Sequence, residues 1–299
     1  MSSAKELGYP HILIQYQNGF LVSKVMFTAC ELGVFDLLQE SEEKLSSKAI
    51  AEHLGSSLHG METLLDACVG LKLLEVEVNK EGAFYCNTEI SEQFLTKSSP
   101  KSQYHTCMYY SKTIYLCWQY LTEAVREGKN QYERAFGISP KAVFEALYRS
   151  EEEMLKFMYG LNAIWSLCGR DVIAAFDLSP FTMICDLGGD FFKDPLPEAE
   201  LYILARILHD WSDENCVQLL TKVQKSCKTG GGVLLIETLL NEDKRGPLES
   251  QLYSLNMLVH TEGKERSPAE YSKLLTASGF KEIKIKKSGK LYDAILGKK

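Results

Sequence analysis

The stretch LYILARILHDW, residues 201–211, decides how this chain folds and where its chemistry lies. Its first residues, Leu201–Leu204, form a short apolar run typical of a buried parallel strand. Arg206, His209 and Asp210 follow just past the carboxyl end of that strand, the edge where open α/β sheets bind ligands. A histidine there, with an ordinary pKa of about 6.5, is suited to act as a general base. The alternative is structural: a strand that runs into a helix, with an aspartate cap and a surface histidine.

Composition indicates a globular protein and argues against several other classes. The chain has 299 residues, of which 45% are hydrophobic, 24% charged and 10% aromatic, enough for two domains. A net charge of −7 without any basic run argues against binding to nucleic acids or membrane surfaces. Nine scattered cysteines without CxxC pairs indicate reduced thiols and a cytoplasmic location. Charged and amide residues near the N-terminus argue against a signal peptide, and no apolar run approaches the length of about 18 residues that spans a membrane.

The first hundred residues have the pattern of an apolar helix pair followed by a winged helix. Residues 11–38 carry helical periodicity and more apolar surface than a small domain buries alone, so we expect a partner subunit. Serines precede two further helices, one ending at Leu54 and one over 58–71. Two short strands, 74–78 and 83–86, follow and are joined by a turn.

Winged helices often bind DNA, but this one lacks the side chains for it. Its second helix offers His59, Glu62 and Asp66 and no arginine, whereas major-groove readers rely on Arg, Lys, Asn and Gln. We therefore expect residues 1–100 to form a dimerisation or substrate-lid module. Aromatic-rich helices are expected over 101–166, with most rings in the core and a few left to line a pocket for a planar ligand.

The last third of the chain predicts the remainder of an α/β domain. The expected elements are a glycine turn at 230–232, a strand at 233–236, helices over 247–262 and 267–279, and a closing hairpin made of 283–287 and 291–296. Asn256 and His260 are four residues apart and therefore share one helix face.

A family resemblance rests on motifs in a specific order. They are YRSEEEMLKFMYGLNAIWSLCGR (148–170), ICDLGG (184–189), GDFFKDPLPEAELYILARILHDW (189–211), CKTGGGVLLIE (227–237) and YSLNMLV (253–259). With the winged-helix start, they resemble the caffeic-acid-type small-molecule O-methyltransferases over nearly the whole chain. The resemblance implies a homodimer with a winged-helix dimerisation domain (1–100). It also implies a helical linker and Rossmann-like methyltransferase domain (101–299, core from about 180), with S-adenosylmethionine (SAM) as methyl donor.

The same resemblance assigns the acceptor side of the site. His209 would be the general base that takes the proton from a phenol or hydroxyindole, and Asp210 would lie against that substrate. Asn256 would hydrogen-bond an acylated side chain of the acceptor, while His260 stands where the family has a glutamine. Glu237, at the end of the strand 233–236, would support His209.

On the cofactor side, the resemblance implies contacts from the helical region and from both strand ends. The SAM-binding residues would be Tyr148, Trp165, Gly189, Asp190, Phe191 and Arg206. No metal is expected, because the histidines are isolated in the sequence and no carboxylate cluster is present. Proton removal by a positioned base typically contributes about 10²–10⁴-fold to the rate. Alignment of the reacting atoms contributes roughly 7–11 kcal/mol.

One segment departs from the family pattern. A nucleotide-binding α/β domain needs a glycine turn that opens a helix and then a second strand whose terminal acid binds the ribose. Here the strand FTMICDLGG (181–189) is followed directly by DFFKDPLPEAELYIL, and only the 14 residues of Leu187–Glu200 separate Asp186 from Leu201. A βαβ unit takes about 30 residues. We therefore predict an in-frame loss between Gly188 and Asp190.

Two expectations about the flanking strands follow from the loss, and a third concerns the cofactor. The flanking strands remain neighbours in parallel, and the first becomes an exposed apolar edge. SAM affinity falls sharply, because the helix N-terminus and the ribose acid are missing. The sequence thus leaves two functions: a SAM-dependent O-methyltransferase, or a non-catalytic protein that keeps the dimerisation module.

Overall fold

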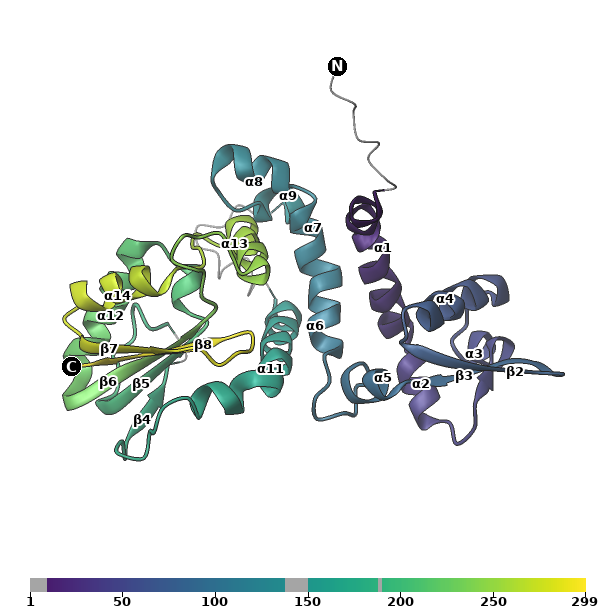
Figure 1. Ribbon diagram of the computed structural model, residues 1–299, viewed down its shortest axis with the longest axis horizontal. Coiled ribbons are helices and arrows are strands. Elements are labelled where there is room, and N and C mark those ends of the chain that lie inside the picture. Colours follow the sequence, from purple (N-terminus) through teal and green to yellow (C-terminus); the bar gives the residue numbers. More distant parts are fainter. Residues whose placement is uncertain (1–9, 138–149, 188–189) are drawn as a thin grey trace, which may run out of the picture. The chain divides into compact units, whose positions relative to one another are not determined.

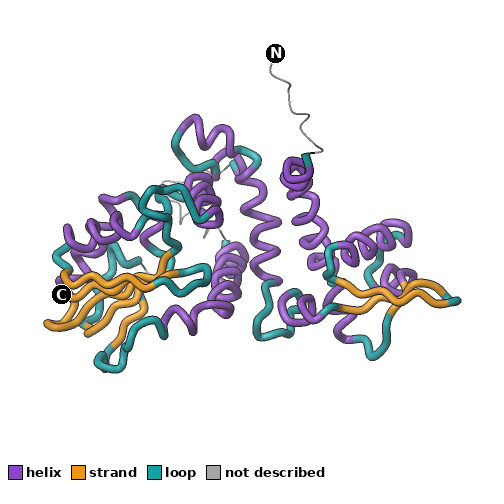
Figure 2. The backbone as a smooth tube through the Cα atoms, viewed as in Figure 1, coloured by secondary structure: helices purple, strands orange, loops and turns teal. Residues whose placement is uncertain are grey.

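The computed structural model describes residues 10–137, 150–187 and 190–299, which form two compact units. One unit comprises the described residues through Thr113 together with Leu155–Ile164, and the other comprises Ile114–Met154 and Trp165–Lys299. Figures 1 and 2 show a small sheet with helices in the first unit and a larger sheet in the second. None of the described helices is long and apolar enough to cross a membrane.

The first unit begins with the predicted helix pair. α1 (His11–Leu32) runs through Gly19 without a break, and α2 (Val34–Glu40) starts after Gly33, whose φ of 84° gives the left-handed cap that favours glycine. Phe35 on α2 is buried. The outer part of α1 instead exposes a set of apolar side chains: Ile12, Leu13, Tyr16, Phe20, Leu21 and Val22. This surface is unpartnered within the described chain.

The winged helix forms as predicted, with one additional strand. Ser46 caps α3 and Ser57 caps α4, each accepting a hydrogen bond from a backbone N–H of the first turn. The elements are β1 (Leu45–Ser46), α3 (Ser47–His53), α4 (Leu58–Gly70), β2 (Leu74–Asn79), β3 (Gly82–Asn87) and α5 (Glu89–Phe94). β1 pairs with β3, so the sheet has the antiparallel order β1-β3-β2.

In the sequence between β3 and β4 (Ile184–Asp186), the described residues form helices, as the aromatic-rich pattern predicted. The elements after α5 are α6 (Tyr104–Tyr109), a π-helical turn (Tyr110–Ile114), α7 (Tyr115–Trp118), α8 (Leu121–Glu127), α9 (Tyr132–Phe136) and α11 (Glu151–Ile173). Gly128 and Gly137 end α8 and α9 in the left-handed conformation. Ser150 caps α11 with three glutamates in its first turn, which suits the positive end of the helix dipole.

A five-stranded mixed sheet forms the core of the second unit. Its strands are β4 (Ile184–Asp186), β5 (Ala199–Ala205), β6 (Cys227–Glu237), β7 (Lys281–Lys286) and β8 (Asp293–Lys298), in the order β4-β5-β6-β8-β7. β4, β5 and β6 are parallel, and β8 and β7 are antiparallel to their neighbours. Continuous apolar runs in β5 and β6 are buried, as expected for central parallel strands. The α/β fold is therefore confirmed.

Helices from the C-terminal half cover this sheet. α12 (Asp213–Ser226) and α14 (Pro268–Ala277) lie side by side and share one buried cluster with β5, β6 and β8 (Figure 1). Ser267 and Glu270 form a capping box at the start of α14, the helix predicted over 267–279. α13 (Leu248–His260) carries Asn256 and His260.

Two details of the sheet bear on the predictions. β4 pairs with β5 in parallel and is an exposed edge, with Ile184 45% exposed, so both expectations for the shortened segment are confirmed. The glycine turn predicted at 230–232 was wrong, because β6 runs through it. The register shifts there instead, with Ala199 opposite Cys227 and Leu201 opposite Gly232, so the glycines form a bulge inside the strand.

Candidate functional site

The predicted base lies on a tight turn at the carboxyl end of β5. Arg206 adopts a positive φ of 56° and donates its N–H to the carbonyl of Ile236, which turns the chain out of the sheet. A 3₁₀ turn, Leu208–Asp210, then presents His209, while the fully buried Leu208 holds the turn in the core. Two apolar residues, Ile207 and Leu208, are followed by two polar ones, so the turn buries Leu208 and leaves the imidazole at the sheet edge.

Three carboxylates surround the His209 imidazole. Nδ1 lies 2.9 Å from Glu265 Oε1 and 3.8 Å from Glu237 Oε2, and Nε2 lies 3.7 Å from Asp210 Oδ1. One donor atom each of His209, Glu237 and Glu265 falls within 4.8 Å of the others, an arrangement that is open to a cation. The expectation of isolated histidines without a carboxylate cluster was therefore wrong for His209, because the fold brings together residues that are distant in sequence.

Glu265 is the nearest partner of the base, and the sequence did not single it out. It lies in the run Lys264–Arg266, which resembles a solvated charged loop, yet its carboxylate is almost completely buried. The only sequence signal was its position two residues before the capping Ser267. Glu237 is buried at the end of β6, and its Oε1 accepts hydrogen bonds from the N–H groups of Ile207 and Leu208 at 3.2 and 2.8 Å. It thus anchors the turn as well as facing the imidazole.

Arg266 stabilises this turn through hydrogen bonds to its backbone carbonyls. Its side chain is fully buried and donates to the carbonyls of Leu208 and Trp211 at 2.8 and 2.7 Å. It also pairs with Asp213 Oδ1 at 2.7 Å, at the start of α12. One planar cation therefore joins both ends of the segment that carries His209 to the next helix.

Gly263 allows the neighbouring loop to approach the base closely. A Cβ at this position would lie 2.0 Å from the carbonyl oxygen of His209 and 2.6 Å from backbone atoms of Asp210 and Trp211. The adjacent Glu262 donates its N–H to the carbonyl of Asp210 at 3.3 Å. Backbone contact of this kind admits only glycine.

The carboxylates change the protonation behaviour of the site. Burial lowers the pKa of His209, but the charges of Glu265, Asp210 and Glu237 outweigh burial and raise that pKa to about 10. Burial is the main cause that raises the pKa of Glu237 to about 7 and that of Asp210 to about 6. An imidazole that faces three fully ionised acids would keep its proton at neutral pH, whereas a general base must be neutral.

The two predicted acceptor residues on α13 lie on the same side of the helix. Asn256 Oδ1 accepts a hydrogen bond from the indole N–H of Trp118 at 2.8 Å. His260 is buried beside Tyr132, and its Nδ1 lies 3.1 Å from the carbonyl of Asn256. Burial lowers the pKa of His260 to about 4, so this imidazole is neutral. The contacts of acceptor with these residues stay a prediction.

Each described residue of the predicted SAM-binding set contacts a different neighbour. Tyr148 and Gly189 lie outside the described residues. The ring of Trp165 packs over Gly169 of its own helix α11. Arg206 stacks its guanidinium 5.4 Å from the ring centroid of Tyr292.

Asp190 and Phe191 belong to the short connection between β4 and β5. Asp190 is exposed and pairs with Lys193 at 2.9 Å. Phe191 is buried in the core, with its ring centroid 6.4 Å from that of Trp211. Lys222 on α12 fastens the connection by donating to three carbonyls, those of Phe191, Phe192 and Asp194, at 2.9, 3.1 and 2.6 Å.

The described residues include only part of the usual SAM-binding elements. A nucleoside methyl donor needs a glycine turn that opens a helix and a strand that ends in an acid for the ribose hydroxyls. Between Asp186 and Ala199 the described chain forms only a turn, and Phe191 is used in the core. The described residues therefore include the predicted base and its carboxylates, whereas a helix-opening glycine turn and a second strand that ends in an acid are not found between β4 and β5 in the described part of the chain.

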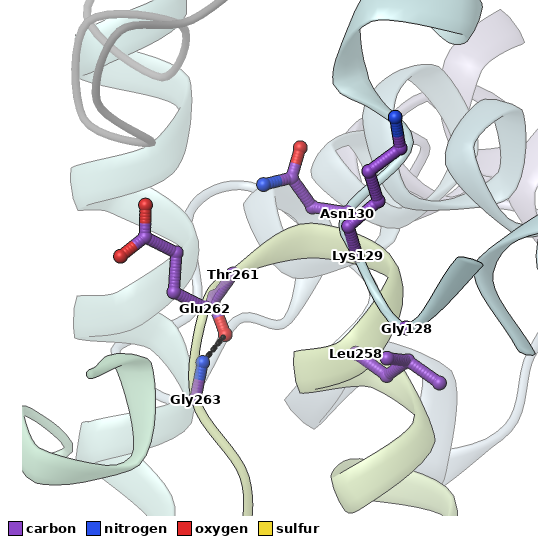
Figure 3. A pocket seen from close by; sticks show the side chains of 7 residues that line it. All are labelled: Gly128, Lys129, Asn130, Leu258, Thr261, Glu262 and Gly263. Carbon is purple, nitrogen blue, oxygen red and sulfur yellow. Dashed lines mark hydrogen bonds between the residues drawn. The ribbon is translucent and has the colours of Figure 1, made fainter. Parts of the chain in front are cut away.

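A pocket of about 270 Å³ opens near the base (Figure 3). It is lined by the α8–α9 loop, the end of α13 and the loop that follows: Gly128, Lys129, Asn130, Leu258, Thr261, Glu262 and Gly263. Through Gly263 its wall touches the segment that holds His209. None of the predicted site residues is among its seven lining residues.

Comparison with known sequences identifies the family. Residues 14–97 match the O-methyltransferase dimerisation domain, and residues 118–189 and 187–281 match the O-methyltransferase domain. The chain belongs to the O-methyltransferase family. The two stretches of the catalytic-domain match meet at residues 187–189, where the sequence predicted an in-frame loss.

Several curated relatives of this methyltransferase carry the same name. Acetylserotonin O-methyltransferases of Gallus gallus and Homo sapiens are 60% and 48% identical to it, and each alignment covers all of both chains. These alignments run over 346 positions, whereas this chain has 299 residues, so 47 positions have no counterpart here. The crystal structure of human N-acetylserotonin methyltransferase in complex with SAM matches with a TM-score of 0.96 at 48% identity, covering 100% of this chain and 99% of that one.

Proposed function

We propose that the site is that of a SAM-dependent O-methyltransferase that converts N-acetylserotonin to melatonin. The observation that carries this proposal is the largely buried His209 at the sheet edge, with Glu265, Glu237 and Asp210 around it, in a chain 60% identical to an acetylserotonin O-methyltransferase. SAM supplies the methyl group in this family. What this chain's own residues contribute is on the acceptor side.

His209 has the role of general base. With Nδ1–H donated to Glu265, the lone pair on Nε2 faces the acceptor and takes the proton of the 5-hydroxyl as the oxygen becomes a nucleophile. Asp210 lies beside Nε2, where its charge stabilises the imidazolium that forms. Asn256 and His260 contact the acetylated side chain from α13.

We also propose that the chain is a homodimer and is cytoplasmic. The match to the dimerisation domain and the exposed apolar residues of α1 support the homodimer. Nine cysteines, all in the described part of the chain and none in a disulfide, support a reducing compartment.

A specific observation favours a second function. β4 is the edge of the sheet, and no helix lies between β4 and β5 among the described residues, so a non-catalytic subunit that dimerises through residues 14–97 is the alternative. Transfer of labelled methyl groups from SAM to N-acetylserotonin, measured beside the Gallus gallus relative, separates the two. Turnover within about tenfold of that relative supports the enzyme. Acceptor binding by calorimetry without any transfer supports the non-catalytic subunit, and loss of both contradicts the proposed site.

A further inference from the structure

The buried glutamates beside His209 have fewer hydrogen-bond donors than they have carboxylate oxygens to receive them. Glu237 and Glu265 are both buried, and each has one oxygen, Oε2, without a hydrogen-bond partner in the described part of the chain. The imidazole has a single Nδ1–H, which lies 2.9 Å from Glu265 and 3.8 Å from Glu237. One donor cannot serve both acids, so Glu237 Oε2 faces a second buried carboxylate without a proton between them.

We propose that Glu237 is a neutral carboxylic acid, and that its protonation keeps His209 unprotonated and available as a base. This inference rests on the proposed role of His209. It makes Glu237 a positioning residue, which acts through the imidazole rather than on the acceptor.

Geometry decides which acid holds the proton. Glu237 Oε1 already accepts two backbone N–H bonds, which leaves Oε2 as the position for an O–H group. Glu265 Oε1 accepts the imidazole N–H at the shorter distance, so Glu237 Oε2 is the oxygen beside the imidazole that lacks a donor. One ligand atom from each of the three side chains lies within 4.8 Å of the others, so the two acids are close neighbours in a buried site.

The surroundings of Glu237 agree with a neutral form. Burial raises its pKa, with the charges of Glu265 and Asp210 adding to the effect and that of His209 opposing it. The other titratable groups that interact with it are Cys216 on α12 and Tyr271 on α14, and burial raises the pKa of both. Arg266, the nearby cation, is already held by Asp213 and two carbonyls.

A proton on Glu237 would reconcile the acidic surroundings of His209 with the need for a neutral imidazole in a general base. With Glu237 neutral, one of the charges that favour imidazolium is removed and the pKa of His209 moves toward the working range of a base. When the acceptor O–H bond breaks, the N–H bond forms at Nε2 while Nδ1–H stays with Glu265. The cluster then gains one positive charge and no buried anion is left without a partner.

The test compares two isosteric variants by a readout that does not depend on turnover. In Glu237→Gln the amide N–H₂ replaces the acid O–H, so we expect the variant to fold at pH 7 with a Tm within about 2 °C of the wild type. Infrared spectra of the wild type at pH 7 should show the carbonyl band of a protonated acid, and Glu237→Gln should lack it. Glu265→Gln should lower the Tm by more, because it removes the charged acceptor of Nδ1–H.

Stability against pH provides the second measurement. Glu237 has a folded pKa of about 7, above its ordinary 4.5, so its contribution to stability is present below 4.5 and is lost as pH rises through 7. The Glu237→Gln variant should lack this decline, whereas Glu249→Gln, at an exposed position, should retain it. Failure of Glu237→Gln to fold, or no protonated-acid band at pH 7, would overturn the inference. Absence of methyl transfer with the band present would count against the proposed function alone.

Discussion

Arg266 shows how much of the site depends on one buried residue outside the reacting atoms. Its guanidinium holds the carbonyls on both sides of His209 and the first acid of α12. Replacing one partner of a buried ion pair leaves the others unsatisfied, which is costly in a low-dielectric interior.

Substitution of Arg266 by Met is therefore expected to reduce the free energy of unfolding by about 3–5 kcal/mol. Arg266→Lys should recover only part of the loss, because an ammonium cannot reproduce the planar fork. Denaturant unfolding at pH 7 measures both. Lys264→Ala is the matched control: Lys264 pairs with the same Asp213 at 3.5 Å but is 46% exposed, so its loss should cost less than about 1 kcal/mol. An equal effect of the two substitutions would contradict the role given to Arg266.

Some residues of the site could be predicted from the sequence, and others could not. His209 was recognisable because an ionisable cluster follows an apolar strand, whereas Glu237 was assigned through the family resemblance. Glu265 was not, since a charged run in a loop has the same pattern whether it is solvated or buried. Its burial depends on Gly263 bringing that loop against the base, a long-range contact that no local pattern encodes.

At the scale of elements, the loop after α13 is fitted to the turn after β5 through backbone contact at Gly263. Gly263→Ala is expected to push the His209 carbonyl away and to reduce the free energy of unfolding by about 1–3 kcal/mol. Acceptor affinity, measured by calorimetry, should fall with it. Gly70→Ala at the end of α4 has open space around its Cβ and should be neutral or gain up to about 1 kcal/mol. Unchanged stability and affinity in Gly263→Ala would show that the contact is not needed.

The edge strand β4 makes a second prediction at this scale. Ile184 is 45% exposed on an unpaired parallel edge, a common route to association between sheets. Ile184→Lys is expected to reduce aggregate formation in light scattering while changing the free energy of unfolding by less than about 1 kcal/mol. Leu248→Lys removes a similarly exposed apolar side chain at the start of α13, away from the edge, and should leave aggregation unchanged. A reduction of the same size in both variants would assign the effect to surface hydrophobicity in general.

Most elements were predictable because their ends carry local signals. Ser46, Ser57 and Ser267 cap helices, and Gly33 ends one. The glycines at 230–232 were misassigned to a turn, because their bulge is determined by the register with β5. A run of glycines indicates that several backbone conformations are open to the chain, but it does not indicate which of them the fold adopts.

At the scale of the whole molecule, 47 aligned positions of the relatives have no counterpart here, and the methyltransferase-domain match divides at residues 187–189. Insertion at that division of the residues that the Gallus gallus relative has there is expected to raise SAM affinity and methyl transfer by about tenfold or more. The matching deletion in the relative should lower both to the level of this chain. Calorimetry with SAM and the labelled-methyl assay measure the pair. If the insertion folds and changes neither quantity, the donor side is supplied in another way.

The connection between β4 and β5 has a consequence for how this fold evolves. The two strands that flank it are parallel neighbours, so their pairing uses no residue of the longer segment found in the relatives. Lys222 then secures the short connection to α12 with a single ammonium group. The donor-binding region is therefore modular: a block at the edge of the sheet can be gained or lost while the strand order of the remaining core is retained.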